Sequence, residues 1–156
     1  MPKIVTLAVT IGTRFPAMQT SLGKVLLAAL PPAEAERVLA EPSRSGITPR
    51  WQPDASERAA VLREVRARGW ALTDEQLAPG IRSVAVPLRD GEGQVIAALN
   101  VNSHAAETPL DVLIGNHLPL LLQAASAISA DWAAWQSAPQ VTAAFSGPAT
   151  SAGEAS

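Results

Sequence analysis

Residues 12–28 constrain the fold of this chain more than any other segment. They read G-T-R-F-P-A-M-Q-T-S-L-G-K-V-L-L-A, which joins the end of an expected strand to a turn and then to a helix start. Thr20 and Ser21 place hydroxyl groups beside backbone N–H groups that have no partner within the helix. A helix N-terminus favours anions, so this segment is suited to hold a carboxylate without a buried Lys or Arg. An ordinary capped core helix is the alternative explanation of a hydroxyl pair alone.

Composition limits the class of protein. The length of 156 residues suits one domain with a buried core, and the apolar fraction is 47%. No apolar run reaches membrane-spanning length, and residues 1–7 lack the regions of a signal peptide. The chain has no cysteine and 2 histidines, which excludes disulfides and leaves little material for a metal site. With a net charge of −2 and scattered Lys and Arg, we expect a cytoplasmic domain that binds nucleic acid poorly by itself.

Periodicity and turn residues predict helices combined with antiparallel strands. The expected helices occupy residues 22–30, residues 33–39 with Pro32 in first position, and a segment that begins at the Asp54 cap and ends at Gly69. The expected strands are 4–11, 70–74, 82–89 and 94–103, with a loop at 41–53 and a hairpin turn at 90–93. This order predicts an α+β fold with a mainly antiparallel sheet flanked by helices.

The C-terminal part is expected to form a long helix followed by a disordered tail. The helix should begin at Thr108, with Pro109 in first position, and continue for about thirty residues, as judged from its apolar periodicity. Pro119 lies inside it and predicts a kink near Gly115, because proline lacks the N–H and clashes with the preceding turn. Residues 137–156 are rich in Ala, Ser, Pro and Gly and lack periodicity, which predicts disorder.

The sequence contains no plausible catalytic constellation. Nucleophile motifs, phosphate-binding loops, dinucleotide fingerprints and metal-binding helix motifs are all absent. His104 and His117 lie far apart and lack an acid partner at a suitable spacing. We therefore expect a protein that is not an enzyme, with no catalytic residues, no metal and no cofactor.

A polar pocket is the better-supported kind of site. Asn100 and Asn102 point to one face of an apolar strand, because strand side chains alternate, and asparagine is a poor strand former. Hairpin pairing brings Ser83 to the same end of the sheet, and Thr73 lies on the short strand before it. These side chains could line a small binding pocket, or the strand could simply end in solvent.

Arginines provide the charged candidates for such a pocket. Arg14 and Arg82 are the possible carboxylate partners, with an ordinary surface position as the alternative for each.

Three ordered blocks resemble the ligand-binding domain of IclR-type transcriptional regulators. Residues 12–28 are similar to the family's G-T-R-x-P-A-x-x-T-S-x-G-[KR]-x-L-L-A run, and residues 74–88 (D-E-Q-L-A-P-G-I-R-S-V-A-V-P-L) to its E-L-x-P-G-[LI]-R-S-[IV]-A-V-P run. Residues 97–101 read A-A-L-N-V, a form found in the branch that controls protocatechuate and β-ketoadipate catabolism. Together the matches extend from about Lys3 to Trp132.

The resemblance implies a GAF-like effector-binding domain over residues 1–136, which senses a small organic acid and adjusts DNA binding by a separate helix-turn-helix domain. Carried over by motif, the effector-binding residues are Ser21, Leu22, Thr73, Ser83, Asn100 and Asn102. Leu22, Ile96 and Ala98 should cover the carbon frame of the effector. Where relatives have small Ser or Cys, this chain has the larger Asn100 and Asn102, which leaves the size and orientation of the effector open.

The resemblance also bears on partners and on the N-terminus. Relatives have a DNA-binding domain, a helix and a hairpin before the strand that matches residues 4–11, so the chain is expected to be N-terminally truncated. Relatives form dimers and dimers of dimers, and a homo-oligomer is expected. An aromatic acid or a β-ketoadipate-like acid is the expected effector. An enzyme of aromatic-acid metabolism and a pure oligomerisation domain are the alternatives.

Overall fold

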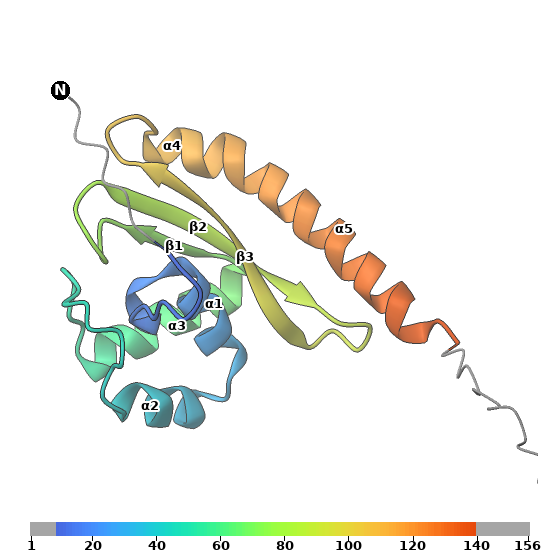
Figure 1. Cartoon of the computed structure of the whole chain (residues 1–156), viewed down its shortest axis with the longest axis horizontal. Helices are drawn as coiled ribbons and strands as arrows, with labels where there is room; N and C mark the ends of the chain where they lie inside the picture. The colour runs from blue at the N-terminus through green and yellow to red at the C-terminus, as the bar shows by residue number, and fades with distance from the viewer. Residues whose placement is uncertain (1–8, 140–156) are drawn as a thin grey trace, which may run out of the picture.

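The chain folds as an antiparallel sheet between two layers of helices (Figure 1). A computed structural model describes residues 9–139. In chain order the elements are the 3₁₀ turn η1 (Ala17–Gln19), α1 (Ser21–Ala29), α2 (Pro32–Ala40), α3 (Ala55–Arg68), β1 (Ala71–Asp74), β2 (Ile81–Arg89), β3 (Val95–His104), α4 (Leu110–Val112), the π-helical turn η2 (Leu113–His117) and α5 (Leu118–Ser137). The expected α+β class is confirmed.

Capping residues, glycine and proline in the sequence predicted most of the helix boundaries correctly. Asp54 caps α3 by accepting the Glu57 N–H at 2.9 Å, and the Glu57 side chain accepts the Asp54 N–H at 2.8 Å. Gly69 ends this helix at φ 82°, a left-handed conformation that costs glycine little. Pro32 occupies the first turn of α2, where its missing N–H is not needed. These boundaries depend on residues within one turn of the helix end.

The predicted N-terminal strand is the exception among the expected elements. Most of residues 4–11 lies outside the described part of the chain, and residues 9–11 have no strand conformation. The expected disordered tail is likewise mostly outside it, although Ser137 itself still belongs to α5.

The register of the sheet determines which polar side chains meet. The strand order is β1-β2-β3 with antiparallel pairing throughout. Ser83 lies opposite Thr73 on one side and opposite Asn102 on the other, and Ala85 lies opposite Asn100. Since these residues alternate with core residues along their strands, they share one face of the sheet. The predicted hairpin and the predicted proximity of Ser83 to the asparagines are therefore confirmed.

Each face of the sheet has its own apolar core. On one face, Ala71 and Ala85 pack against α1 and α3, through Val25 and Leu62 among others. On the opposite face, Val84 and Val86 pack against η2 and α5, whose buried residues are Leu113, Leu118, Leu121 and Ala125. The polar row described above lies on the α1 face, so the start of α1 covers it.

The C-terminal helix differs from the expectation in two details. Pro109 is the N-cap rather than the first helical residue, which is a shift of one position. Near the predicted kink the helix widens into the π turn η2, where the Leu118 N–H bonds to the Leu113 carbonyl. The ring of Pro119 would clash with the carbonyl of Gly115, and this widened turn contains that residue. Figure 1 shows α4 and α5 as one continuous helix.

The same helix contradicts one expectation from composition. Residues Leu110–Ser137 form a helix of 28 residues with a mean hydropathy of 1.3 in its most apolar part, which by length and composition alone could span a membrane. The length of the helix agrees with the expected length of about thirty residues; its separate apolar runs are short, but averaged along the helix they give this apolar segment. One side of the helix packs on the sheet, as a core helix does, but Leu120 and Trp135 are 64% and 60% exposed on its other side.

Candidate functional site

The start of α1 is held in a fixed geometry by its cap. The Thr20 side chain accepts the Gly23 N–H at 3.1 Å, and the Thr20 carbonyl accepts the Lys24 N–H at 3.1 Å. Within the described residues, the N–H groups of Ser21 and Leu22 have no hydrogen-bond acceptor. These amides are the free donors that a helix N-terminus offers to an anion.

Glycine at position 23 allows this helix start to approach η1. A Cβ atom at Gly23 would lie 2.6 Å from the carbonyl carbon and from the Cα atom of Ala17, closer than any real contact of that kind. Only glycine therefore permits the observed packing. The glycine of the sequence motif thus serves the backbone geometry of the site.

A cluster of buried hydroxyl groups lies against this helix start. The Oγ atoms of Ser21 and Ser83 are 2.7 Å apart and share a hydrogen bond. Thr73, opposite Ser83 in the sheet, is equally buried. Both serines are at most 5% exposed, so these hydroxyls are screened from bulk water. The structure therefore brings Ser21, Thr73 and Ser83 together as the sequence predicted.

The predicted asparagine pair completes one side of the cluster. The Nδ2 atom of Asn100 donates to Oδ1 of Asn102 at 3.1 Å, with the amide orientation assigned from this hydrogen bond. Asn100 is half-buried and Asn102 is exposed. Asn102 lies opposite Ser83 on the neighbouring strand, so both amides lie at the rim of the hydroxyl cluster.

These residues line one cavity of about 480 Å³. Its volume is within the range of small-molecule sites, and its wall combines apolar side chains with a few polar groups. All of the predicted effector-binding residues line it, together with a rim of other residues: Ser21, Leu22, Thr73, Ser83, Asn100 and Asn102, and Val9, Phe15, Gln19, Thr20, Leu77, Ile81, Ser103 and His104. Ile96 and Ala98, expected to cover a ligand's carbon frame, are not among the lining residues.

The predicted arginines are not part of this cavity wall. Arg82 points to the opposite face of β2 from Ser83, where its Nε donates to Asp74 at 2.8 Å and its guanidinium donates to the Thr108 carbonyl at 2.9 Å. Arg14 is exposed and lines a different cavity, beside the loop 41–53. Alternation along β2 could have indicated the position of Arg82.

Lys24 is a further residue of the site that the sequence interpretation did not single out. It is 1% exposed, and its Nζ donates to the Leu72 carbonyl at 2.6 Å, to Thr73 Oγ1 at 3.2 Å and to Gln76 Oε1. Burial, followed by the nearby charge of Arg68, lowers the pKa of Lys24 to about 8, although Glu64 acts in the opposite direction. Helical spacing could have indicated that Lys24 is buried, because position 24 lies about one turn after the buried position 21.

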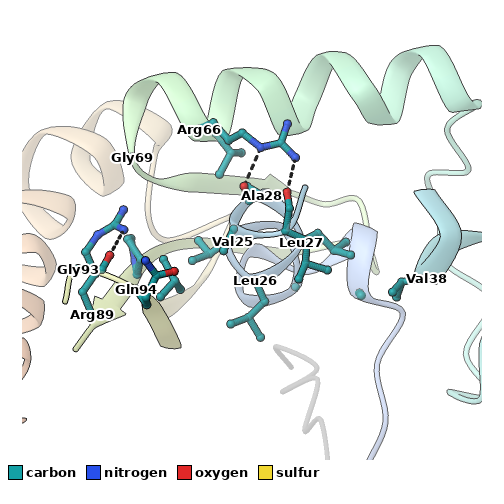
Figure 2. A pocket seen from close by; sticks show the side chains of 17 residues that line it. Val25, Leu26, Leu27, Ala28, Val38, Arg66, Gly69, Arg89, Gly93 and Gln94 are labelled. Carbon is teal, nitrogen blue, oxygen red and sulfur yellow. Dashed lines mark hydrogen bonds between the residues drawn. The ribbon is translucent and has the colours of Figure 1, made fainter. Parts of the chain in front are cut away.

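Two larger hollows in the described part of the chain lack a comparable cluster of buried hydroxyl groups. One, of about 790 Å³, lies beside the second half of α1 and the β2–β3 hairpin (Figure 2). Its arginines bond to the protein itself, since Arg66 donates to the carbonyls of Ala28 and Leu30 and Arg89 to that of Gly93. The other, of about 880 Å³, contains Arg58, which is paired with Glu36 at 2.7 Å, and the exposed Arg14 and Arg44. The smaller cavity at the start of α1 is therefore the better candidate.

Comparison with known proteins identifies close relatives of this fold and sequence. A family model described as the bacterial transcriptional regulator IclR C-terminal domain matches residues 1–130. The Pca regulon regulatory protein of Pseudomonas putida is 37% identical over 122 residues, which is 78% of this chain and 42% of that protein. The chain thus spans less than half the length of this relative.

Solved structures agree with the sequence relatives. A transcriptional regulator from Rhodococcus sp. RHA1 superposes with a TM-score of 0.74 at 37% identity, over 86% of this chain and 54% of that one. The inducer-binding domain of the Acinetobacter transcription factor PobR, solved as a double mutant with 3-hydroxybenzoic acid, gives a TM-score of 0.65 at 31% identity. That match covers 74% of this chain and 66% of the PobR chain.

Proposed function

The chain belongs to the IclR C-terminal domain family of bacterial transcriptional regulators, which are not enzymes, and we propose that its cavity at the start of α1 binds a small organic acid as effector. The observation that supports this most directly is the convergence of donors. The free N–H groups of Ser21 and Leu22 and the hydroxyls of Thr73 and Ser83 meet at a cavity of about 480 Å³. Carboxylate oxygens accept from such donors, and the dipole of α1 favours their charge.

The relatives suggest an aromatic acid or a product of its breakdown. The P. putida relative is named for the Pca regulon, and the PobR domain was solved with a hydroxybenzoic acid. Protocatechuate, 4-hydroxybenzoate and β-ketoadipate are the candidate effectors for this chain. In this proposal the amides of Asn100 and Asn102 meet the polar groups at the far end of the effector, and Leu22 covers its carbon frame.

Effector binding would act on DNA indirectly. The bound acid changes the arrangement of this cytoplasmic domain, and a separate helix-turn-helix domain, supplied by the rest of the regulator, contacts the DNA. The part of the P. putida relative that this chain matches, 42% of its length, would carry the sensing function in this proposal.

Titration calorimetry with a panel of aromatic and ring-cleavage acids tests the proposal. Asn100→Leu should weaken the best ligand by about one to two orders of magnitude, because a lost hydrogen bond to a buried partner costs about 1–3 kcal/mol. Asn116→Leu is the matched control, since Asn116 is exposed and lies outside the cavity wall. Parental affinity in both Asn100→Leu and Asn102→Leu would contradict the placement of the effector, and no binding of any acid would contradict the proposed function.

We also propose that the chain forms a homo-oligomer through the outer side of α5. Exposed apolar side chains gather there, including Leu120, Ile128, Trp132 and Trp135, and the two tryptophan rings lie 5.0 Å apart. An apolar surface of this kind is typical of a protein interface. Sedimentation should show a dimer or tetramer, and a monomer at micromolar concentration would contradict this.

A further inference from the structure

Lys24 carries a buried positive charge directly behind the wall of the candidate cavity. All three of its hydrogen-bond acceptors are neutral: the Leu72 carbonyl, Thr73 Oγ1 and Gln76 Oε1. The ion pairs found among residues 9–139 do not include Lys24. A buried charge without an opposite charge in contact is costly, and an anion placed nearby would reduce that cost.

The hydrogen bond from Lys24 also determines which way the Thr73 hydroxyl points. An ammonium group can only donate, so Thr73 Oγ1 accepts, and the hydroxyl proton must be donated elsewhere. Thr73 lines the cavity, and no protein acceptor for its proton is found in the described part of the chain. The buried lysine therefore orients Thr73 as a donor toward a ligand.

The neighbouring groups of the cavity wall also act as hydrogen-bond donors. The bond between the Oγ atoms of Ser21 and Ser83 uses one hydroxyl proton and leaves the other free to donate. The Ser21 and Leu22 amides are donors only. This part of the cavity wall thus presents hydrogen-bond donors from several directions, with the Lys24 cation behind them. Such a wall suits a ligand with anionic oxygens better than a ligand with a neutral amide group.

We propose that Lys24 is a positioning residue that makes the cavity selective for carboxylates over neutral ligands of the same shape, with Thr73 as the hydroxyl through which it acts. This inference rests on the proposed function, because it specifies the charge of the effector at that site. Lys24 does not line the cavity itself, so it acts on the ligand through its field and through the orientation of Thr73.

The other charged groups around Lys24 leave its charge available. On α3, Glu64 and Arg68 are paired with each other at 2.8 Å. At the end of β1, Asp74 is paired with Arg82 at 2.8 Å, and in the following loop Glu75 lies 3.8 Å from Arg50. Burial lowers the pKa of Lys24 to about 8, so its ammonium group loses its proton just above neutral pH. A carboxylate bound nearby would favour the charged form and raise this pKa again.

The test compares benzoate with benzamide, which have the same shape and differ in charge, on the full 156-residue chain at pH 7. The parent should bind benzoate at least about tenfold more tightly, the ratio that one charge-assisted hydrogen bond can supply. Lys24→Gln, which keeps a donor and removes the charge, should lose most of this preference by weakening benzoate alone. Thr73→Val should do the same. Arg63→Gln, which removes an exposed charge on α3, is the control and should keep the preference.

Several outcomes would overturn the inference. Equal weakening of both ligands in Lys24→Gln would mean that Lys24 only supports the fold, and a parent without preference for benzoate would contradict the selectivity itself. If Lys24→Gln does not fold, the pH dependence of the parent protein tests the inference. Its preference for benzoate over benzamide should fall at least about fivefold between pH 7 and pH 9.5, and an unchanged preference over this range would refute the inference. Binding of no acid at all would instead contradict the proposed function.

Discussion

Gly23→Ala tests whether the backbone contact between η1 and α1 holds the site together. The new Cβ would lie 2.6 Å from two backbone carbons of Ala17, whereas carbon atoms normally stay ~3.5–4.0 Å apart. The two segments would therefore have to separate by roughly 1 Å, because no flexible side chain can move aside instead. This displacement would lengthen the hydrogen bonds that the Thr20 N–H and Oγ1 make to the Ala17 carbonyl, now 3.4 Å and 3.2 Å.

The expected magnitude follows from opposing terms. Overpacking of a tight contact costs about 1–3 kcal/mol, and each weakened hydrogen bond adds up to about 1 kcal/mol. Alanine is a better helix former than glycine by about 1 kcal/mol, which offsets part of this. We expect a net loss of about 2–4 kcal/mol in the free energy of unfolding, or a fall in Tm of roughly 10 °C.

Urea unfolding followed by circular dichroism measures this loss, and Gly115→Ala supplies the control. Gly115 is also helical, but a Cβ there would meet nothing within 4 Å, so this variant should be neutral or stabilised by up to about 1 kcal/mol. The same small effect in both variants would refute the reasoning, because it would show that η1 moves away from α1 at no cost.

The remaining predictions concern the cap of α3, the hydroxyl pair and the buried lysine. Asp54→Ala removes half of the capping box with Glu57 and should cost about 1 kcal/mol in urea unfolding; no change would contradict the observed cap. Ser83→Ala leaves the Ser21 hydroxyl buried without its partner and should cost about 1–3 kcal/mol, whereas an unchanged midpoint would indicate that a water molecule replaces the bond. Because the pKa of Lys24 falls from 10.5 to about 8 on folding, the unfolded chain binds more protons at alkaline pH, so stability should rise by about 2–3 kcal/mol from pH 7 to pH 10. Lys24→Gln should flatten this rise, and a fall in parental stability over the same range would contradict the burial of a charged Lys24.

The sequence predicted those features that depend on neighbours along the chain. The capping box at Asp54, the left-handed Gly69 and the hairpin turn each involve residues within one turn of one another. Strand alternation and the hairpin together placed Ser83 near the end of the strand that carries Asn100 and Asn102, whereas an irregularity between Leu88 and Arg89 determines that Ser83 lies opposite Asn102. The recognisable motifs then indicated the family, which the comparisons confirmed.

Tertiary structure decided where charged and apolar groups lie in space. Lys24 appears in the sequence as an ordinary helical lysine, and only the packing of α1 against β1 and the loop after it buries its ammonium group among three neutral oxygens. By sequence Arg82 is a possible carboxylate partner, but in the structure its Nε donates to Asp74, eight residues away. Such contacts join residues far apart in the chain or depend on side-chain direction, and no local pattern encodes them. The free energy of a buried charge depends on these distant partners, and the polarity of the site was therefore decided by the tertiary structure. The sequence by itself determined the helices, the strands and their connections.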